Sequence, residues 1–128
     1  MDTTETTPAT RHEVAAWFEI PSVDFDRAQR FYATLLDVTV FCPPVSPRMG
    51  IIKYRPDAGG GAIVERGVPS ADGVTFFFQV NDRLDATAAR IEAAGGRLLG
   101  PIVDIAPNGR MQLFLDTEGN RLGLHSER

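Results

Sequence analysis

The two halves of this 128-residue chain show the same order of predicted elements, which restricts the folds that it can adopt. Each half begins with a strand, continues with a helix and ends with three more strands. In the first half these elements are expected at residues 14–20, 24–36, 38–41, 49–55 and 61–66. In the second half they are expected at 75–80, 84–94 and 97–100, and in a closing hairpin at 113–128. The sequence therefore predicts an α+β fold made of two tandem βαβββ modules.

Local signals support the first helix and the closing hairpin. Apolar residues recur at the spacing of one helical face, namely Ala28, Phe31, Tyr32, Leu35 and Leu36. Asp24 or Asp26 supplies the cap that begins this helix. In the hairpin, the turn from Asp116 to Asn120 contains Gly119, and we expect Gly119 and Asn120 to accept the positive φ angles that such a turn needs.

Composition excludes several classes of partner. Hydrophobic residues make up 43% of the chain, charged residues 23%, and the net charge is −4, a profile typical of a globular domain. We expect no nucleic-acid partner, because such binding depends on clustered basic residues and the arginines here are scattered. No window approaches the ~18 apolar residues of a membrane span. The single cysteine, Cys42, agrees with a reducing, cytoplasmic location.

The polar, Thr-rich segment 1–12 is expected to be a flexible tail, which leaves 13–128 as one domain. Its modules would span about 13–67 and about 74–126. Each module would form a small curved sheet with its helix on the convex side, and the two concave faces would enclose a cleft.

Alternation along the strands predicts which side chains face that cleft. Phe18, Ile20, Phe76, Phe78, Val80, Leu122 and Leu124 are expected to pack beneath the helices. The residues expected to face the cleft and contact a ligand are Trp17, Glu19, Thr75, Phe77, Gln79, Met111, Leu113, Gly123 and His125. The alternative is that Trp17, Phe77, Met111 and Leu113 fill the cleft and close it into core.

The order of elements and three segments resemble the vicinal oxygen chelate superfamily, which includes glyoxalase I, extradiol dioxygenases and fosfomycin and bleomycin resistance proteins. These segments are FEIPSVDFDRAQRFYATLL (18–36), VNDRLDATAARIEAAGG (80–96) and FLDTEGNRLGLHS (114–126). The resemblance implies a glyoxalase/bleomycin resistance-like fold and a homodimer. It also implies substrate-contacting positions at Met111 and Leu113, by similarity to fosfomycin resistance proteins.

Enzymes of this superfamily typically hold one divalent metal with His and Glu ligands, and this sequence departs from that pattern. The ligand positions fall on Trp17, Thr75 and Gly123, of which the first and third cannot coordinate a metal and the second is a weak neutral ligand. A fourth position lies within residues 62–65, where only Glu65 could serve. The resemblance therefore implies a member without the usual metal or any other cofactor, unless Glu19, His125 and Glu65 converge on a relocated site.

Three functions are compatible with these residues. The first is metal-independent binding of a small, partly aromatic organic molecule, as in bleomycin resistance-type proteins. The second is a glyoxalase-like lyase, isomerase or cyclase that uses Glu19 and His125 as acid and base, or a relocated metal. In an apolar cleft the pKa of Glu19 would be raised and His125 would titrate near neutrality. The third is a non-catalytic association domain with a closed cleft.

Overall fold

The computed structural model describes residues 14–46, 48–57 and 59–128 as two sheets and two helices. The first module contains β1 (Trp17–Pro21), α1 (Phe25–Leu36), β2 (Met49–Ile52) and β3 (Gly60–Val64). The second contains β4 (Phe76–Gln79), α2 (Leu84–Arg90), β5 (Arg97–Asp104), β6 (Arg110–Leu115) and β7 (Arg121–Ser126). The predicted flexible tail at 1–12 lies outside the described residues.

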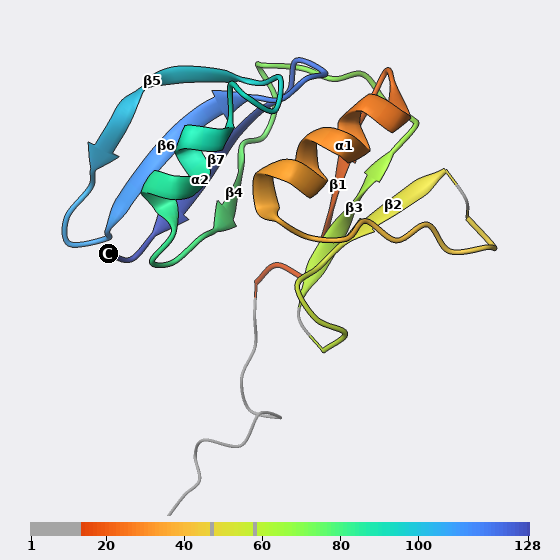
Figure 1. Ribbon diagram of the computed structural model, residues 1–128, viewed down its shortest axis with the longest axis horizontal. Helices are drawn as coiled ribbons and strands as arrows, with labels where there is room; N and C mark the ends of the chain where they lie inside the picture. Colours follow the sequence, from red (N-terminus) through yellow and green to blue (C-terminus); the bar gives the residue numbers. More distant parts are fainter. Residues whose placement is uncertain (1–13, 47, 58) are drawn as a thin grey trace, which may run out of the picture.

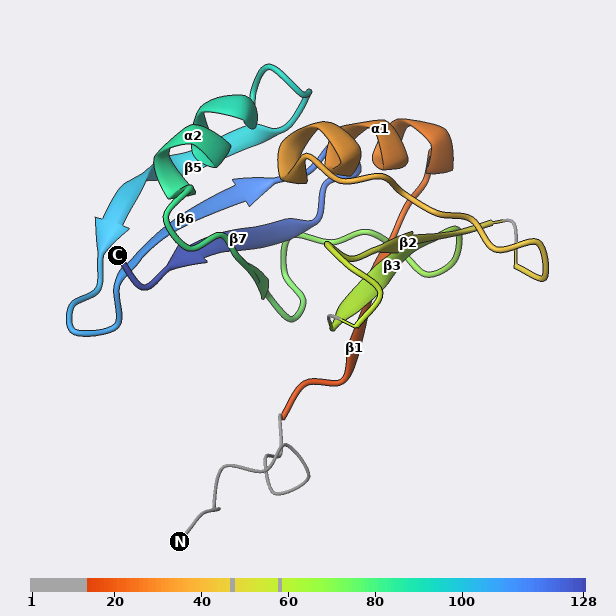
Figure 2. The same cartoon turned by 60° about the horizontal axis from the view of Figure 1, so that its bottom comes forward.

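The two sheets have corresponding topologies. The order is β1-β3-β2 in the first and β4-β7-β6-β5 in the second, and each first strand pairs in parallel with the last strand of its module. Both helices lie on one side of the sheets (Figures 1 and 2) and leave the other side uncovered. This arrangement confirms the predicted α+β fold with two related modules.

The first helix forms where its sequence predicts. The Asp24 side chain accepts a hydrogen bond from the Arg27 backbone N–H at 3.0 Å, and Asp37 ends the helix in the left-handed region at a φ of 54°. The five apolar residues of the predicted face are all buried, together with Phe25. They join one hydrophobic core that the second module completes with side chains such as Phe114 and Leu124.

Several predicted boundaries differ from the structure. Strand β1 begins at Trp17 and not at residue 14, β2 ends at Ile52 and not at residue 55, and β6 begins at Arg110 and not at residue 113. Residues 38–41 do not form a strand; only Phe41 makes an isolated bridge, to Ile51, because Pro43 and Pro44 follow and cannot donate to a ladder. Regular helix α2 ends at Arg90, and turns continue to Gly95. Strand β5 extends to Asp104, beyond the predicted end at Gly100, because a register shift between Leu99 and Val103 lets pairing with β6 continue.

The modules meet along a seam where β1 faces β4. The Phe18 and Phe76 rings stack across it with centroids 4.2 Å apart. One end of the seam, which we call the closed end, is where β1 leads into α1 and the β6–β7 turn packs against them. The other, the open end, is where β1 begins and β4 ends.

Candidate functional site

A cavity of about 480 Å³ occupies the open end of the seam. The first module supplies its apolar walls through Trp17, Phe18, Leu36, Val38, Ile52 and Tyr54. The second module supplies Phe76, Phe77, Phe78 and Gln79. Because few polar groups line it, this cavity resembles the apolar sites in which proteins bind small organic molecules.

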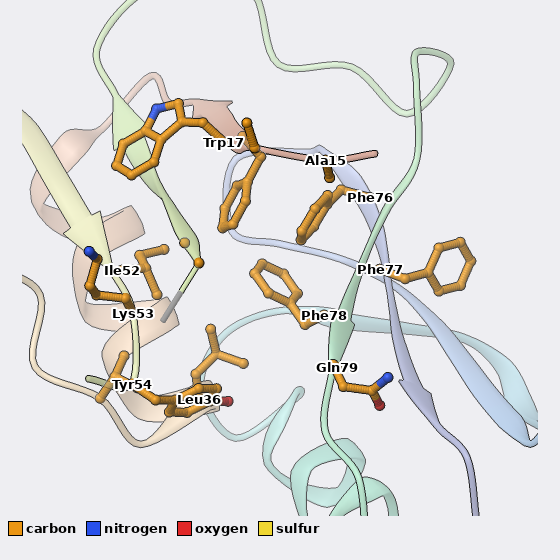
Figure 3. A pocket seen from close by; sticks show the side chains of 15 residues that line it. Ala15, Trp17, Leu36, Ile52, Lys53, Tyr54, Phe76, Phe77, Phe78 and Gln79 are labelled. Carbon is orange, nitrogen blue, oxygen red and sulfur yellow. The ribbon is translucent and has the colours of Figure 1, made fainter. Parts of the chain in front are cut away.

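Three phenylalanines form the inner surface of the cavity. Phe76 meets Phe78 edge-to-face with centroids 5.1 Å apart, and Phe18 meets Phe78 in the same way at 5.6 Å. Figure 3 shows Phe76 and Phe78 on the side of β4 that faces Ile52 and Leu36, whereas Phe77 and Gln79 point to the opposite side. The aromatic surface is therefore built at the junction of the modules.

Alternation along β1 and β4 places side chains as the sequence indicates, but the cavity includes residues from both faces. Trp17, Phe77 and Gln79 of the predicted ligand-binding set line the cavity. Phe18, Phe76 and Phe78 were expected only to pack beneath the helices, yet they also line it. The run of three phenylalanines at 76–78 could have indicated that both faces of β4 are aromatic, because successive side chains of a strand point to opposite faces.

The remaining residues of the predicted set lie outside this cavity. Met111 and Leu113 lie on β6, and their register partners His125 and Gly123 lie on β7, so the four are adjacent on the sheet. Thr75 precedes β4, and its hydroxyl accepts hydrogen bonds from Arg121 Nε and Nη2 at 3.2 and 2.9 Å.

Glu19 and His125, the predicted acid–base pair, belong to different sheets and have different partners. Glu19 forms an ion pair with Arg66 and accepts a hydrogen bond from Trp17 Nε1 at 3.3 Å. The hydrogen bond from Arg66 lowers the pKa of Glu19, which is opposite to the direction expected for an apolar cleft. His125 Nε2 lies 2.7 Å from the Asn108 carbonyl oxygen, and because a carbonyl only accepts, this contact requires a proton on Nε2.

The positions that hold a metal in related enzymes do not offer a donor set here. Thr75 is engaged by the cationic Arg121, and Glu65 is engaged by Arg48 at 2.8 Å, which lowers the pKa of Glu65. A Cβ atom on Gly123 would overlap the Phe77 ring, so any longer side chain there would require that ring to move. Among the described residues, no three His, Cys, Asp or Glu side chains are grouped as metal ligands.

The closed end of the seam depends on the β6–β7 turn. Gly119 has the expected positive φ, 95°, whereas Asn120 has another role: its side-chain amide donates to the Pro21 carbonyl at 2.9 Å. Tyr32 of α1 donates from its hydroxyl to Asp116 Oδ2 at 2.7 Å inside the core. Sequence reasoning assigned the turn carboxylates only to local turn chemistry, because partners about 90 residues away in the chain leave no local signal.

Glu118 connects the turn to the start of α1 through three hydrogen bonds to its carboxylate. Its Oε1 accepts from the backbone N–H groups of Val23 and Asp24 at 2.8 and 2.7 Å, and its Oε2 accepts from Arg27 Nε at 2.8 Å. Burial by itself would raise the pKa of Glu118, but the hydrogen bonds from Arg27, the two backbone groups and Thr117 outweigh it and lower the pKa to about 2. The turn of module two thus anchors the beginning of α1.

Comparison with known proteins identifies the family. The model of the Glyoxalase/Bleomycin resistance protein/Dioxygenase superfamily matches residues 14–124. The chain belongs to this superfamily. A glyoxylase-like domain-containing protein from Didymella fabae is 30% identical over 119 residues, which cover 85% of this chain and 90% of that protein. The resemblance inferred from the sequence is therefore confirmed.

Solved structures of superfamily members share the fold. A glyoxalase/bleomycin resistance protein from Albidiferax ferrireducens superposes with a TM-score of 0.76 at 18% identity and covers 91% of this chain and 100% of its own. The antibiotic binding protein TnmS3 from a Streptomyces species superposes with a TM-score of 0.65 at 23% identity, over 90% of this chain and 98% of its own. No helix among the described residues is long and apolar enough to cross a membrane.

Proposed function

We propose that this protein binds a small, partly aromatic organic molecule in the cavity at the open end of the seam, without a metal. The observation that carries this proposal is the surface formed by Phe18, Phe76 and Phe78, which lines a space of about 480 Å³ between the modules. Burial of an aromatic ligand there would be favoured by the removal of apolar surface from water and by ring–ring contacts.

The predicted binding residues relate to this proposal in two ways. Trp17 would contact the ligand in the cavity, and Phe77 and Gln79 border it with side chains that point to the opposite side of β4. Met111, Leu113, Gly123 and His125 share the face of Phe77 and Gln79, so this proposal does not include them, and Glu19 and Thr75 lie beside Arg66 and Arg121. Glu19 is held ionised by Arg66 and the Nε2 proton of His125 is committed to Asn108, so these contacts favour binding over proton transfer.

Binding of a fluorescent aromatic probe tests the proposal. N-phenyl-1-naphthylamine should bind saturably at one site per chain after exhaustive treatment with a chelator, and it should accept excitation energy from Trp17, the only tryptophan. Phe76→Ala should weaken the binding about tenfold, because a buried aromatic contact contributes roughly 1–2 kcal/mol. Phe41→Ala, at an exposed phenylalanine outside the cavity, is the matched control and should leave affinity unchanged.

Absence of saturable binding would contradict the proposal, and so would binding that requires an added divalent metal ion. Equal losses in Phe76→Ala and Phe41→Ala would place the probe elsewhere on the protein.

We also propose that the protein is a homodimer, as the superfamily resemblance implies. Strand β5 is an edge strand, and its Leu98 and Val103 are 37% and 40% exposed. An exposed apolar edge is stabilised by a partner. Sedimentation equilibrium should give twice the mass of the chain, and Val103→Lys should shift the equilibrium toward the monomer; a monomer at high concentration would contradict this.

A further inference from the structure

Lys53 is the only lysine of the chain, and it lines the cavity. Every other one of the 13 Lys and Arg residues is an arginine. Among the described residues that line the cavity, Lys53 alone has a charged side chain. A single ammonium in an otherwise apolar and aromatic site is a specific polar feature, and small-molecule sites use such groups to select and orient their ligands.

Lys53 lies beside a position where the strands approach closely. It follows β2 directly, and a Cβ on Gly60 of the neighbouring strand would overlap the Ile52 carbonyl oxygen and lie 2.9 Å from the Lys53 Cβ. On the other side of Gly60, its register partner on β1 is Trp17. Glycine at this position therefore allows the close approach that places Lys53 and Trp17 on the same cavity wall.

The ammonium of Lys53 retains hydrogen-bonding capacity. It donates to the Pro56 carbonyl oxygen at 3.2 Å, and an ammonium has three protons to donate. Arg48 and Arg66 of the same module are paired with Glu65 and Glu19, whereas no carboxylate in the described part of the chain forms an ion pair with Lys53. Lys53 therefore carries a positive charge that no described acidic side chain compensates.

A second cation lies near this end of the cavity. The Arg83 guanidinium, at the start of α2, lies over the Tyr54 ring with its carbon 5.1 Å from the ring centroid. Tyr54 lines the cavity, so Arg83 and Lys53 bring positive charge from both modules to the open end of the seam. In a chain with a net charge of −4, this local excess favours an anionic ligand and disfavours a cationic one.

We propose that the ligand is an aromatic anion, with its rings on Phe18, Phe76 and Phe78 and its acidic group on the Lys53 ammonium. This inference rests on the proposed binding function and specifies the ligand class. Carboxylates, sulfonates and phosphates share the required chemistry, since each presents oxygen acceptors for a charge-assisted hydrogen bond.

Two probes with the same rings separate the aromatic contribution from the charge. 8-Anilinonaphthalene-1-sulfonate and N-phenyl-1-naphthylamine differ only in the sulfonate. We expect the sulfonate to bind about tenfold more tightly at low salt, since hydrogen bonds to charged groups are typically worth that factor or more. This preference should decrease as salt is added, and the two probes should compete for one site per chain.

Substitutions assign the preference to one residue. Lys53→Met, which keeps most of the side-chain length without the charge, should abolish the preference for the sulfonate and leave binding of N-phenyl-1-naphthylamine within about twofold. Lys53→Arg should retain the preference. Arg55→Met is the matched control, because Arg55 is an exposed cation two residues away that pairs with Asp57 and does not line the cavity.

Each outcome has a distinct meaning. Equal affinity of the two probes, or a preference that survives in Lys53→Met, would overturn the assignment of an anionic ligand to Lys53 while leaving the aromatic binding site intact. An equal loss of the preference for the sulfonate in Arg55→Met would also overturn it, because the preference would then come from the summed positive charge of the β2–β3 loop and not from Lys53. Failure of both probes to bind would instead contradict the proposed binding function.

Discussion

The two ends of the seam between the modules are built differently. At the closed end, Asp116 and Glu118 accept hydrogen bonds from α1 and its N-terminus, and Asn120 donates one to β1, so the β6–β7 turn is joined to both elements. At the open end, aromatic and aliphatic side chains surround a cavity, and the modules are joined by ring contacts and the Arg83–Tyr54 stack. The difference indicates that hydrogen bonds at the closed end fix the relative position of the modules, whereas aromatic ring contacts join them at the open end, where we propose that a ligand binds.

Loss of the Glu118 carboxylate should have the largest effect on stability. Glu118→Gln should lower the free energy of unfolding by about 2–3 kcal/mol, because it removes a buried charge that three donors satisfy at the start of α1. Chemical denaturation provides the measurement. Asp57→Asn, which breaks an ion pair whose side chains are 69% and 80% exposed, should change stability by less than about 0.5 kcal/mol. Similar values for both variants would contradict the distinction between the ends.

The same carboxylate predicts the acid sensitivity of the fold. Because the pKa of Glu118 is lowered from 4.5 to about 2 on folding, its contribution is fully present above pH 4.5 and is lost as the pH falls toward 2. Unfolding measured across this window should show a smaller loss of stability in Glu118→Gln than in the unsubstituted protein. Parallel pH profiles would show that the lowered pKa makes no contribution to folding.

Removal of one hydroxyl group compares the two ends directly. Tyr32→Phe should cost about 1–2 kcal/mol, because it removes a buried donor from Asp116. The chain has one other tyrosine, Tyr54, which is 48% exposed at the open end, and Tyr54→Phe should cost less than about 0.5 kcal/mol. Thermal unfolding of the two variants side by side gives the comparison, and the reverse ranking would refute it.

The contact that joins the modules at the open end should contribute least. Arg83→Gln should destabilise the protein by no more than about 0.5–1 kcal/mol, the range for an exposed cation–π pair. If the Arg83–Tyr54 stack restricts entry, the same substitution should accelerate association of N-phenyl-1-naphthylamine in stopped-flow measurements. A stability loss as large as that of Glu118→Gln would show that both ends are structural clamps.

Sequence reasoning predicted the helices, most strands and the superfamily, because periodicity and order are local or repeated signals. It also predicted which side of β1 and β4 each residue occupies. It did not locate the cavity, since alternation assigns a side chain to a face and does not show where two modules separate. Arg66 and Asn108 were missed as partners of Glu19 and His125, because they lie 47 and 17 residues away in the chain. Lys53 left a signal that was not used, its status as the single lysine.

Methyl NMR of the chelator-treated protein with N-phenyl-1-naphthylamine tests the central claim most directly. Ile52 lines the cavity, Ile91 is buried in the core outside its lining, and Met111 reports the uncovered face of β6. We predict that the Ile52 methyl resonance shifts strongly and saturably, whereas Met111 and Ile91 do not shift. Shifts confined to Met111, or none at Ile52 under saturating probe, would contradict a ligand site at the open end of the seam.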